Sequence, residues 1–349
     1  MLFEASVEGT AFGIDANTGK VIWRQRFTDD PQAGNAGTLL YHDGLVYIPV
    51  QSVEEPLSKM MPNLKINFRG KVVALDAKTG KIVWQRQLVE APKNGVAVWS
   101  SFALDPQMNA LFFTTGNNYT GETSELAESL IAVNAKTGEI LWSRQAYQHD
   151  LWTAAQPLGP DYDFAGGAQL FEANICGQMR QLVGAGQKSG EYWVFDRLTG
   201  KPVWRSVVSY GGKGGGMHAE ASIGDGKIYV WGNNSYSNYG LPPKDYPMNI
   251  KALDAATGKY LWVKPNAQPA GINSAGFLAN DVYFVASSTG EIHAYRTSDG
   301  KNLWTNKLIP SIGASLNVVG DTLYIGVGLP KPFGTGENSH GVFAYSVGR

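Results

Sequence analysis

The amino-acid sequence predicts an all-β fold, a β-propeller of four-stranded antiparallel blades, with seven units visible. Three observations predict this fold. A hairpin phrase that ends in tryptophan occurs six times along the 349 residues, and two further strand patterns precede most copies. Only 17% of the residues are charged and 42 are glycine, which leaves little material for solvent-facing helices. Four-stranded units in series are typical of propeller blades.

The repeated phrase predicts a β-hairpin in each unit. In most copies an alternating apolar run leads to Asp/Asn-x-x-Thr-Gly, and a second strand then ends at tryptophan, as in GIDANTGKVIW and ALDAKTGKIVW. Glycine and Asx residues supply the positive φ that a tight hairpin needs. The tryptophans lie 42 to 62 residues apart, at Trp23, Trp84, Trp142, Trp204, Trp262 and Trp304. Because the units share this phrase, we interpret it as turn chemistry and blade packing and not as the functional site.

The first and last units are incomplete. Patterns such as residues 38–50 (TLLYHDGLVYIPV) predict strands A and B of a unit, and the hairpin phrase predicts strands C and D. The first unit lacks strand A, and the last, which finishes with GVFAYSV, lacks strand D and its tryptophan. We therefore expect one propeller domain over residues 1–349 that is incomplete at both ends, as if an N-terminal blade were missing from a larger ring.

Charge and cysteine content exclude several classes of protein. There are 29 Lys+Arg and 30 Asp+Glu residues without a basic block, which argues against nucleic-acid and anionic-membrane binding. No apolar window reaches the length of about 18 residues that a spanning helix needs. The start, MLFEASVEGT, lacks the pattern of a secretory signal. The single cysteine, Cys176, excludes an intrachain disulfide, a cysteine-rich zinc site and c-type haem attachment.

One face of the predicted disc is expected to hold the functional site. Strands alternate in direction, so the B-to-C and D-to-A loops lie on one face and the Thr-Gly hairpins lie on the other. Binding and catalysis usually reside on loops that a rigid scaffold holds. The long loops of the first face are residues 51–69, 117–129, 147–166, 209–219, 232–249 and 329–340.

The candidate site residues on this face occur once and break the repeat. They are Glu54, Glu55, Trp99, Asn117, Asp161, Asp163, Lys188 and His218. A flat aromatic ring, carboxylates, an amide oxygen and an ammonium group could hold a planar anionic cofactor beside a hard cation such as Ca²⁺. The residues alone leave an alternative open, in which the acids are ordinary solvated loop residues and Trp99 packs like its neighbours.

An ordered series of motifs supports a family resemblance. The motifs are NFRGKVVALDAKTG, VWSSFALDP, TTGN, QAYQHDLW, PDYDFAGGAQLF and GQKSGEYWVFDRLTG, which together run from residue 67 to residue 200. With its repeat, the whole chain resembles the family of pyrroloquinoline quinone (PQQ) dependent alcohol dehydrogenases. Within that family it is most similar to the polyvinyl alcohol dehydrogenase-like branch. The family ring has eight blades, so the resemblance implies that one N-terminal blade is absent.

The resemblance implies a cofactor and metal site in the first half of the chain. Trp99 would be the tryptophan on which the PQQ ring stacks. Asn117 would be the amide ligand of Ca²⁺, and Glu55, or less surely Glu54, would be the carboxylate ligand. Asp163, in the DFAG stretch, would be the catalytic aspartate and is also counted among the candidate ligands of the metal.

The resemblance also implies roles for two residues further along. Lys188, in GQKSG, would be the cation that hydrogen-bonds the reactive carbonyl of the quinone. His218 lies in the family's fifth-unit loop and would belong to the cofactor site.

Several positions depart from the family pattern. Lys65 and Ile66 stand where the family has adjacent cysteines, so no vicinal disulfide forms there. Ala219 replaces a tryptophan of the fifth-unit loop. The stretched spacing before the DFAG motif leaves Asp161 as an alternative base. Ala165 stands where lanthanide-using relatives have an extra aspartate, which favours Ca²⁺.

The expected function is a quinoprotein dehydrogenase. Ca²⁺ would act as a Lewis acid on the quinone carbonyl, Lys188 would stabilise the developing negative charge, and Asp163 would remove the alcohol proton as hydride leaves. The substrate would be a small or polymeric alcohol. An external acceptor such as a cytochrome c would take the electrons, because the chain has no haem motif. The resemblance implies a periplasmic or secreted location.

Two other functions stay open. The rival is a non-catalytic propeller that holds another protein on its loop face or a blade edge, as the outer-membrane assembly lipoprotein of the same repeat family does. A glycosidase-like or lectin-like propeller that uses Asp161 and Asp163 as paired carboxylates ranks last, because residues two apart in a loop rarely take opposed positions across a sugar ring.

Overall fold

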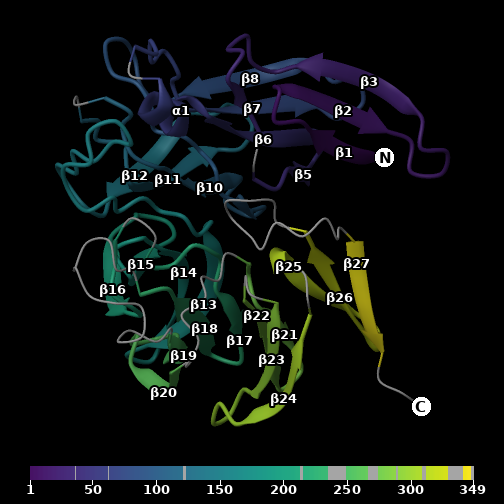
Figure 1. Cartoon of the computed structure of the whole chain (residues 1–349), viewed down its shortest axis with the longest axis vertical. Coiled ribbons are helices and arrows are strands. Elements are labelled where there is room, and N and C mark those ends of the chain that lie inside the picture. Colours follow the sequence, from purple (N-terminus) through teal and green to yellow (C-terminus); the bar gives the residue numbers. More distant parts are fainter. Residues whose placement is uncertain are drawn as a thin grey trace. The chain divides into compact units, whose positions relative to one another are not determined.

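The computed structural model consists of β-sheets and one short helix over the part of the chain that it describes (Figure 1). The structure describes residues 1–35, 37–61, 63–120, 123–212, 215–234, 249–265, 274–287, 290–308, 312–328 and 341–346. The chain forms two compact units, Met1–Leu170 and Phe171–Arg349. Each unit is described by itself.

The first unit contains three antiparallel sheets. The first sheet has the strand order β1 (Leu2–Ala5), β2 (Thr10–Ile14), β3 (Val21–Arg26). The second contains β4 (Ala33–Gly34), β6 (Leu45–Ser52), β7 (Lys71–Asp76) and β8 (Ile82–Gln87), with β5 (Leu40–His42) also paired to β6. The helix α1 (Glu54–Met60) follows β6. The third sheet contains β9 (Ala103–Asp105), β10 (Ala110–Thr114), β11 (Ser129–Asn134) and β12 (Ile140–Gln145).

The second unit contains four antiparallel sheets. Three have four strands each: β13 (Gln169–Ile175), β14 (Gln178–Gly186), β15 (Glu191–Asp196) and β16 (Pro202–Val207); β17 (Ser222–Gly224), β18 (Lys227–Gly232), β19 (Asn249–Asp254) and β20 (Tyr260–Pro265); β21 (Phe277–Ala279), β22 (Val282–Ala286), β23 (Glu291–Arg296) and β24 (Asn302–Lys307). The last contains β25 (Ile312–Val319), β26 (Thr322–Val327) and β27 (Gly341–Ser346).

These sheets confirm the predicted all-β propeller with seven units. The described sheets number seven, and the first and last of them have three strands, as the absence of strand A and of strand D predicted. Among the described residues, no helix is long and apolar enough to cross a membrane. Most of the expected loops 232–249 and 329–340 lies outside the described residues.

The repeated tryptophans join neighbouring sheets, which confirms their structural interpretation. In the first unit, Trp23 Nε1 donates to the carbonyl oxygen of Ala77 at 2.9 Å, and Trp84 Nε1 donates to Ala135 at 3.0 Å. Gly80 lies against the Trp23 ring with φ +74°, and a Cβ there would come within 2.6 Å of the indole. The Thr-Gly turn of one hairpin is therefore the docking surface for the tryptophan of the preceding sheet.

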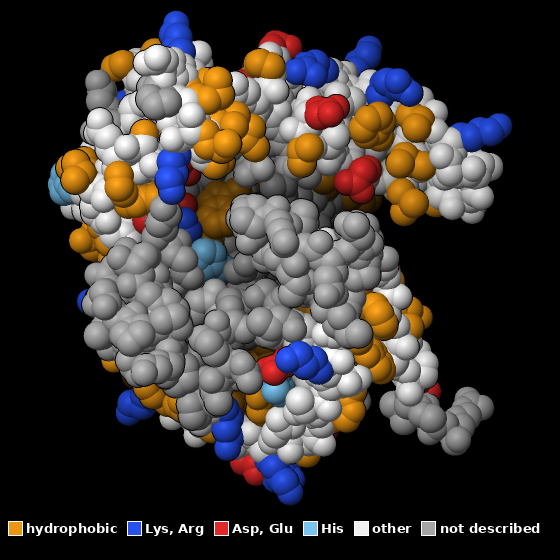
Figure 2. All heavy atoms as spheres, viewed as in Figure 1, with side chains coloured by type: hydrophobic (Ala, Val, Ile, Leu, Met, Phe, Trp, Pro, Cys, Tyr) orange, Lys and Arg blue, Asp and Glu red, His pale blue; other side chains and the backbone are white. Residues whose placement is uncertain are grey.

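The core of the first unit lies between the inner strands. One buried cluster includes Val72 and Ala74 of β7, Leu111 and Phe113 of β10 and Ile131 of β11. The outer strands are more exposed, and Figure 2 shows hydrophobic side chains over β1–β3 and basic and acidic side chains interspersed on the visible face. This mixture agrees with the balanced charge of the sequence.

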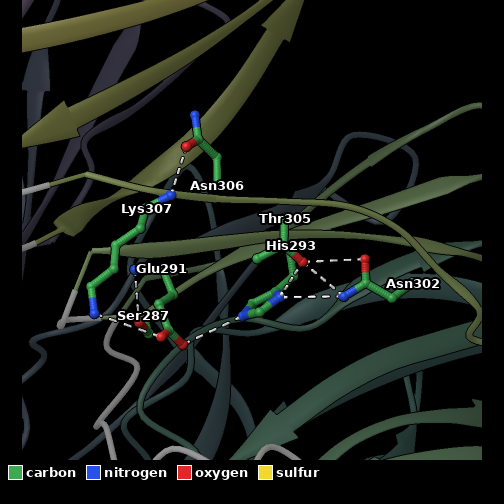
Figure 3. A network of polar contacts seen from close by, with 7 residues as sticks. All are labelled: Ser287, Glu291, His293, Asn302, Thr305, Asn306 and Lys307. Atoms are coloured by element: carbon green, nitrogen blue, oxygen red, sulfur yellow. Dashed lines mark hydrogen bonds and ion pairs between the residues drawn. The ribbon is translucent and has the colours of Figure 1, made fainter.

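In the second unit, polar side chains of β23 and β24 face one another (Figure 3). The Glu291 carboxylate lies 3.8 Å from Lys307 Nζ and 3.7 Å from His293 Nε2. His293 Nδ1 lies 3.2 Å from Thr305 Oγ1. Glu291 and Lys307, like His293 and Thr305, are directly opposite in the strand register. We interpret these contacts as cross-strand pairs that stabilise the sheet.

Candidate cofactor and metal site

The sequence analysis placed Glu54 and Glu55 in an irregular loop. In the structure they are instead the first two residues of the helix α1. The Glu54 side chain is 4% exposed, and its Oε2 accepts the backbone N–H groups of Asn67 at 3.0 Å and Phe68 at 2.9 Å. Burial raises the pKa of Glu54, and these two donors oppose the rise. Glu54 therefore holds the chain at residues 67–68 against α1.

Glu55 points to a different partner. Its Oε1 accepts Asn117 Nδ2 at 2.6 Å, and the same nitrogen lies 2.9 Å from the carbonyl oxygen of Asn118 and 3.2 Å from that of Trp152. Asn117 follows β10 and is 1% exposed. An amide nitrogen and oxygen exchange places on a half-turn of the side chain. That half-turn would set Asn117 Oδ1 beside the Glu55 carboxylate, and two such oxygens suit a hard cation.

Trp99 and Asp163 converge on the residue before Asn117. A Cβ at Gly116 would lie 3.0 Å from Trp99 Nε1 and 3.4 Å from Asp163 Oδ2. Backbone hydrogen bonds hold this segment, because Gly116 N–H donates to Ala97 at 2.9 Å. Glycine at this position avoids crowding the indole nitrogen and the carboxylate with a side chain.

Three of the four acids of the candidate site are buried, and Glu55 is half-buried. Glu54 and Asp163 are each 4% exposed, and Asp161, which has φ +61°, is 1% exposed. The alternative that these three are solvated loop residues is therefore wrong. Their burial means that their charges act in a medium that screens them less than water does.

Tyr119 is a buried ring that feels the charge of two of the candidate carboxylates. Its ring stacks on Phe68, with 5.7 Å between centroids. Burial raises the pKa of Tyr119 well above its usual value, and the negative charges of Glu55 and Asp163 add to the rise. Among the described residues no three His, Cys, Asp or Glu side chains form a metal cluster. A metal here would therefore depend on Asn117 together with these carboxylates.

Asp150 is a residue that the sequence analysis did not single out. It is 4% exposed, its Oδ1 accepts the N–H of Trp152 at 2.9 Å, and its Oδ2 accepts the N–H of Tyr162 at 2.9 Å. Burial raises the pKa of Asp150, and the charge of Asp163 adds to this rise. The only signal in the sequence was its place in the QAYQHDLW motif, which gave it no role.

The second unit brings Lys188 and His218 together. Lys188 follows β14 and is 9% exposed, and His218 Nε2 lies 2.9 Å from the carbonyl oxygen of Gly215. Burial lowers the pKa of His218 to about 4, and the positive charge of Lys188 contributes. The imidazole is therefore neutral at pH 7. The predicted set thus divides into two groups, with Glu55, Trp99, Asn117, Asp161 and Asp163 in the first unit and Lys188 and His218 in the second.

Two family models match separate parts of the chain. Residues 90–209 match the glucose/ethanol/alcohol dehydrogenase β-propeller domain that uses PQQ. Residues 248–327 match a second PQQ model, described as outer membrane protein assembly factor BamB. The first match includes Trp99, Asn117, Asp163 and Lys188.

Individual relatives are similar over more of the chain. A polyvinylalcohol dehydrogenase of Sphingopyxis sp. is 29% identical over 343 residues, which cover 87% of this chain and 51% of the relative. A polyvinylalcohol dehydrogenase of Pseudomonas sp. is 28% identical and covers 84% of this chain and 50% of the relative. The chain thus spans about half the length of these curated relatives.

A solved structure shares the fold. The quinohemoprotein alcohol dehydrogenase ADHIIG of Pseudomonas putida HK5 superposes with a TM-score of 0.74 at 20% identity, covering 94% of this chain and 61% of that one.

Proposed function

We propose that this chain, a β-propeller of the PQQ-dependent dehydrogenase family, binds PQQ with Ca²⁺ and oxidises an alcohol. The observation that supports this most is the arrangement in the first unit: Glu55 and Asn117 are in contact at 2.6 Å, next to a glycine that lies close to both Trp99 Nε1 and Asp163 Oδ2. A scaffold has no need of a half-buried carboxylate paired with a buried amide next to an indole nitrogen and a second carboxylate.

The residues of this arrangement fit the cofactor and the metal. Carboxylate and amide oxygens are the ligands that Ca²⁺ prefers, and Glu55 and Asn117 supply one of each. Glu54 is engaged with the backbone of residues 67 and 68, which leaves Glu55 as the proposed ligand. Trp99 would offer its ring to a flat cofactor.

The chemistry then divides between the bound groups and the chain. PQQ, when bound, would supply a carbonyl carbon that accepts hydride, and Ca²⁺ held by Glu55 and Asn117 would supply a Lewis acid beside it. Asp163 orients the alcohol and accepts its hydroxyl proton on a carboxylate oxygen as the hydride leaves. A side chain at position 116 would lie against one oxygen of this carboxylate, which glycine avoids.

Lys188 has the proposed role of stabilising the negative charge that develops on the quinone oxygen. Within the second unit it is buried beside a neutral His218, so its charge is not shared with a protonated imidazole. His218 is proposed to shape the surroundings of that ammonium group.

The names of the relatives guide the substrate proposal. Two of them are polyvinylalcohol dehydrogenases, so we propose that the alcohol is a secondary one, free or part of a polymer. We propose an external electron acceptor such as a cytochrome c, and a periplasmic or secreted location. The chain's match to a BamB model over residues 248–327 favours protein binding as the second candidate function.

Reconstitution with PQQ and Ca²⁺, followed by dye-linked alcohol oxidation, tests the proposal. Replacing Asp163 by Asn should lower the rate by about 10²- to 10⁴-fold, because the proton acceptor is lost while its size is kept. PQQ retention should not change. Full activity of Asp163→Asn would refute the assignment, and a selective loss in Asp161→Asn would move the base to Asp161.

A further inference from the structure

The segment between β12 and β13 makes a long excursion before it reaches Asp163. Residues 149–163 contain no strand, and two non-glycine residues in it, His149 and Asp161, have φ near +61°. Trp152 and Pro157 form an isolated bridge inside the excursion. A segment without strands needs hydrogen bonds to the rest of the protein if the Asp163 carboxylate at its end is to be held in one position.

The Asp150 carboxylate accepts hydrogen bonds from both ends of this segment. Asp150 Oδ1 accepts the N–H of Trp152, and Asp150 Oδ2 accepts the N–H of Tyr162, each at 2.9 Å. The backbone N–H of Asp161 also helps to lower the pKa of this carboxylate. The far end of the excursion is thus tied down one residue before Asp163.

The near end is tied to the proposed metal ligands. The carbonyl oxygen of Trp152 lies 3.2 Å from Asn117 Nδ2, and the same nitrogen contacts Glu55 Oε1. In the protein without metal, a continuous set of hydrogen bonds therefore runs from Glu55 through Asn117 and Trp152 to Asp150 and on to Tyr162.

Gly159 shows how closely the excursion passes over the carboxylate. Its φ is +110°, and a Cβ there would lie 2.7 Å from Asp150 Oδ1 and 3.4 Å from Trp152 N. A side chain at this position would displace the carboxylate from its two donors. The local sequence thus leaves space for Asp150 to bridge the excursion.

We infer that Asp150 is a positioning residue that fixes Asp163 relative to Asn117. This inference rests on the proposed function for Asp163 as the base, but the placement of the Asp163 carboxylate can be measured without any turnover. Asp150 itself does not touch a substrate in this scheme. It acts through the backbone of residues 152, 161 and 162.

The test replaces Asp150 by Asn and measures two properties of the protein without cofactor. An asparagine keeps the size but sets an NH2 group against one of the backbone N–H donors, so one end of the excursion is released. Hydrogen exchange of residues 150–163 should accelerate at least about tenfold, which corresponds to about 1.4 kcal/mol of local stability. Asp163, buried in the wild type, should couple to a carbodiimide and amine several-fold faster.

A matched control uses another buried carboxylate. Asp105 is 3% exposed and accepts the N–H groups of Gln107 and Met108 at 2.9 and 3.0 Å, in the turn between β9 and β10. Asp105→Asn should leave exchange in residues 150–163 and labelling of Asp163 as in the wild type. If Asp150→Asn does not fold, Gly159→Ala gives the same test, because it displaces a carboxylate that is still present.

In the reconstituted protein, Asp150→Asn should lower kcat about 10- to 100-fold with KM and PQQ retention nearly unchanged, as misplacement of one catalytic group does. Unchanged exchange and unchanged Asp163 labelling in both Asp150→Asn and Gly159→Ala would overturn the inference. If those two changes occur while wild-type protein binds PQQ but oxidises no alcohol, the positioning role stands and the proposed function fails.

Discussion

Replacing Glu54 and Glu55 by glutamine, one at a time, tests which of these adjacent residues holds the metal. Glu54 Oε2 accepts the N–H groups of Asn67 at 3.0 Å and Phe68 at 2.9 Å, and Asn67 N also lies 3.3 Å from Oε1. A glutamine at position 54 loses the charge and sets its NH2 group against Asn67 N–H. Hydrogen bonds to charged acceptors contribute about 1.5–3 kcal/mol and neutral ones about 0.5–1.5 kcal/mol, so two weakened bonds cost about 2 kcal/mol.

This cost has a measurable size in thermal unfolding. A loss of about 2 kcal/mol lowers the Tm of a unit of 150–250 residues by about 4–8 °C. Circular dichroism of Glu54→Gln should show this shift, and PQQ binding below the Tm should persist because Glu55 and Asn117 are unchanged. Glu55→Gln should show the reverse behaviour: a Tm within about 1 °C of the wild type and loss of Ca²⁺-dependent PQQ binding.

The contrast between the two variants decides the assignment. If Glu54→Gln keeps the wild-type Tm but loses cofactor binding, Glu55 is not the ligand. The ligand would then be Glu54, the alternative that the sequence left open. A fall in Tm for both variants with cofactor binding kept by both would remove the metal site from this helix.

Three further predictions concern the second unit and the repeat. Burial is the main cause of the low pKa of His218, and the positive charge of Lys188 adds to it, so replacing Lys188 by Met should raise this pKa from about 4 by part of the difference from its ordinary value. An imidazole titration by NMR that does not move would show that the two side chains are apart. Since the pKa of His218 is lower in the folded than in the unfolded protein, wild-type stability should fall as pH decreases from about 6.5 to about 4, and His218→Gln should flatten this part of the urea-unfolding profile. Replacing Trp84 by Phe removes the indole N–H that bonds to Ala135, which should cost about 1–2 kcal/mol in urea unfolding; an unchanged midpoint would contradict the docking role.

The fold was predictable because it is repetitive. Each copy of the hairpin phrase adds an independent signal, and the partner of Trp23 is the same type of turn as the partner of Trp84. The helix α1 was not predictable, since its seven residues contain Pro56 and too few turns for an apolar period to appear.

The burial of the site acids was also not predictable from the residues. Asp161 and Asp163 lie among proline, glycine and tyrosine in a segment whose composition resembles an exposed loop. Their burial depends on packing within the first unit, and the role of Asp150 depends on hydrogen bonds to backbone N–H groups. Neither feature leaves a residue pattern in the chain.

Calorimetric titration of Ca²⁺-loaded protein with PQQ tests the central claim most directly. The wild type is predicted to bind PQQ at micromolar concentration, and Glu55→Gln and Trp99→Ala are predicted to bind it at least about tenfold more weakly, because each removes one contact of more than about 1.4 kcal/mol. An intact fold that gives no binding heat at high micromolar PQQ would contradict the account and favour a protein-binding propeller.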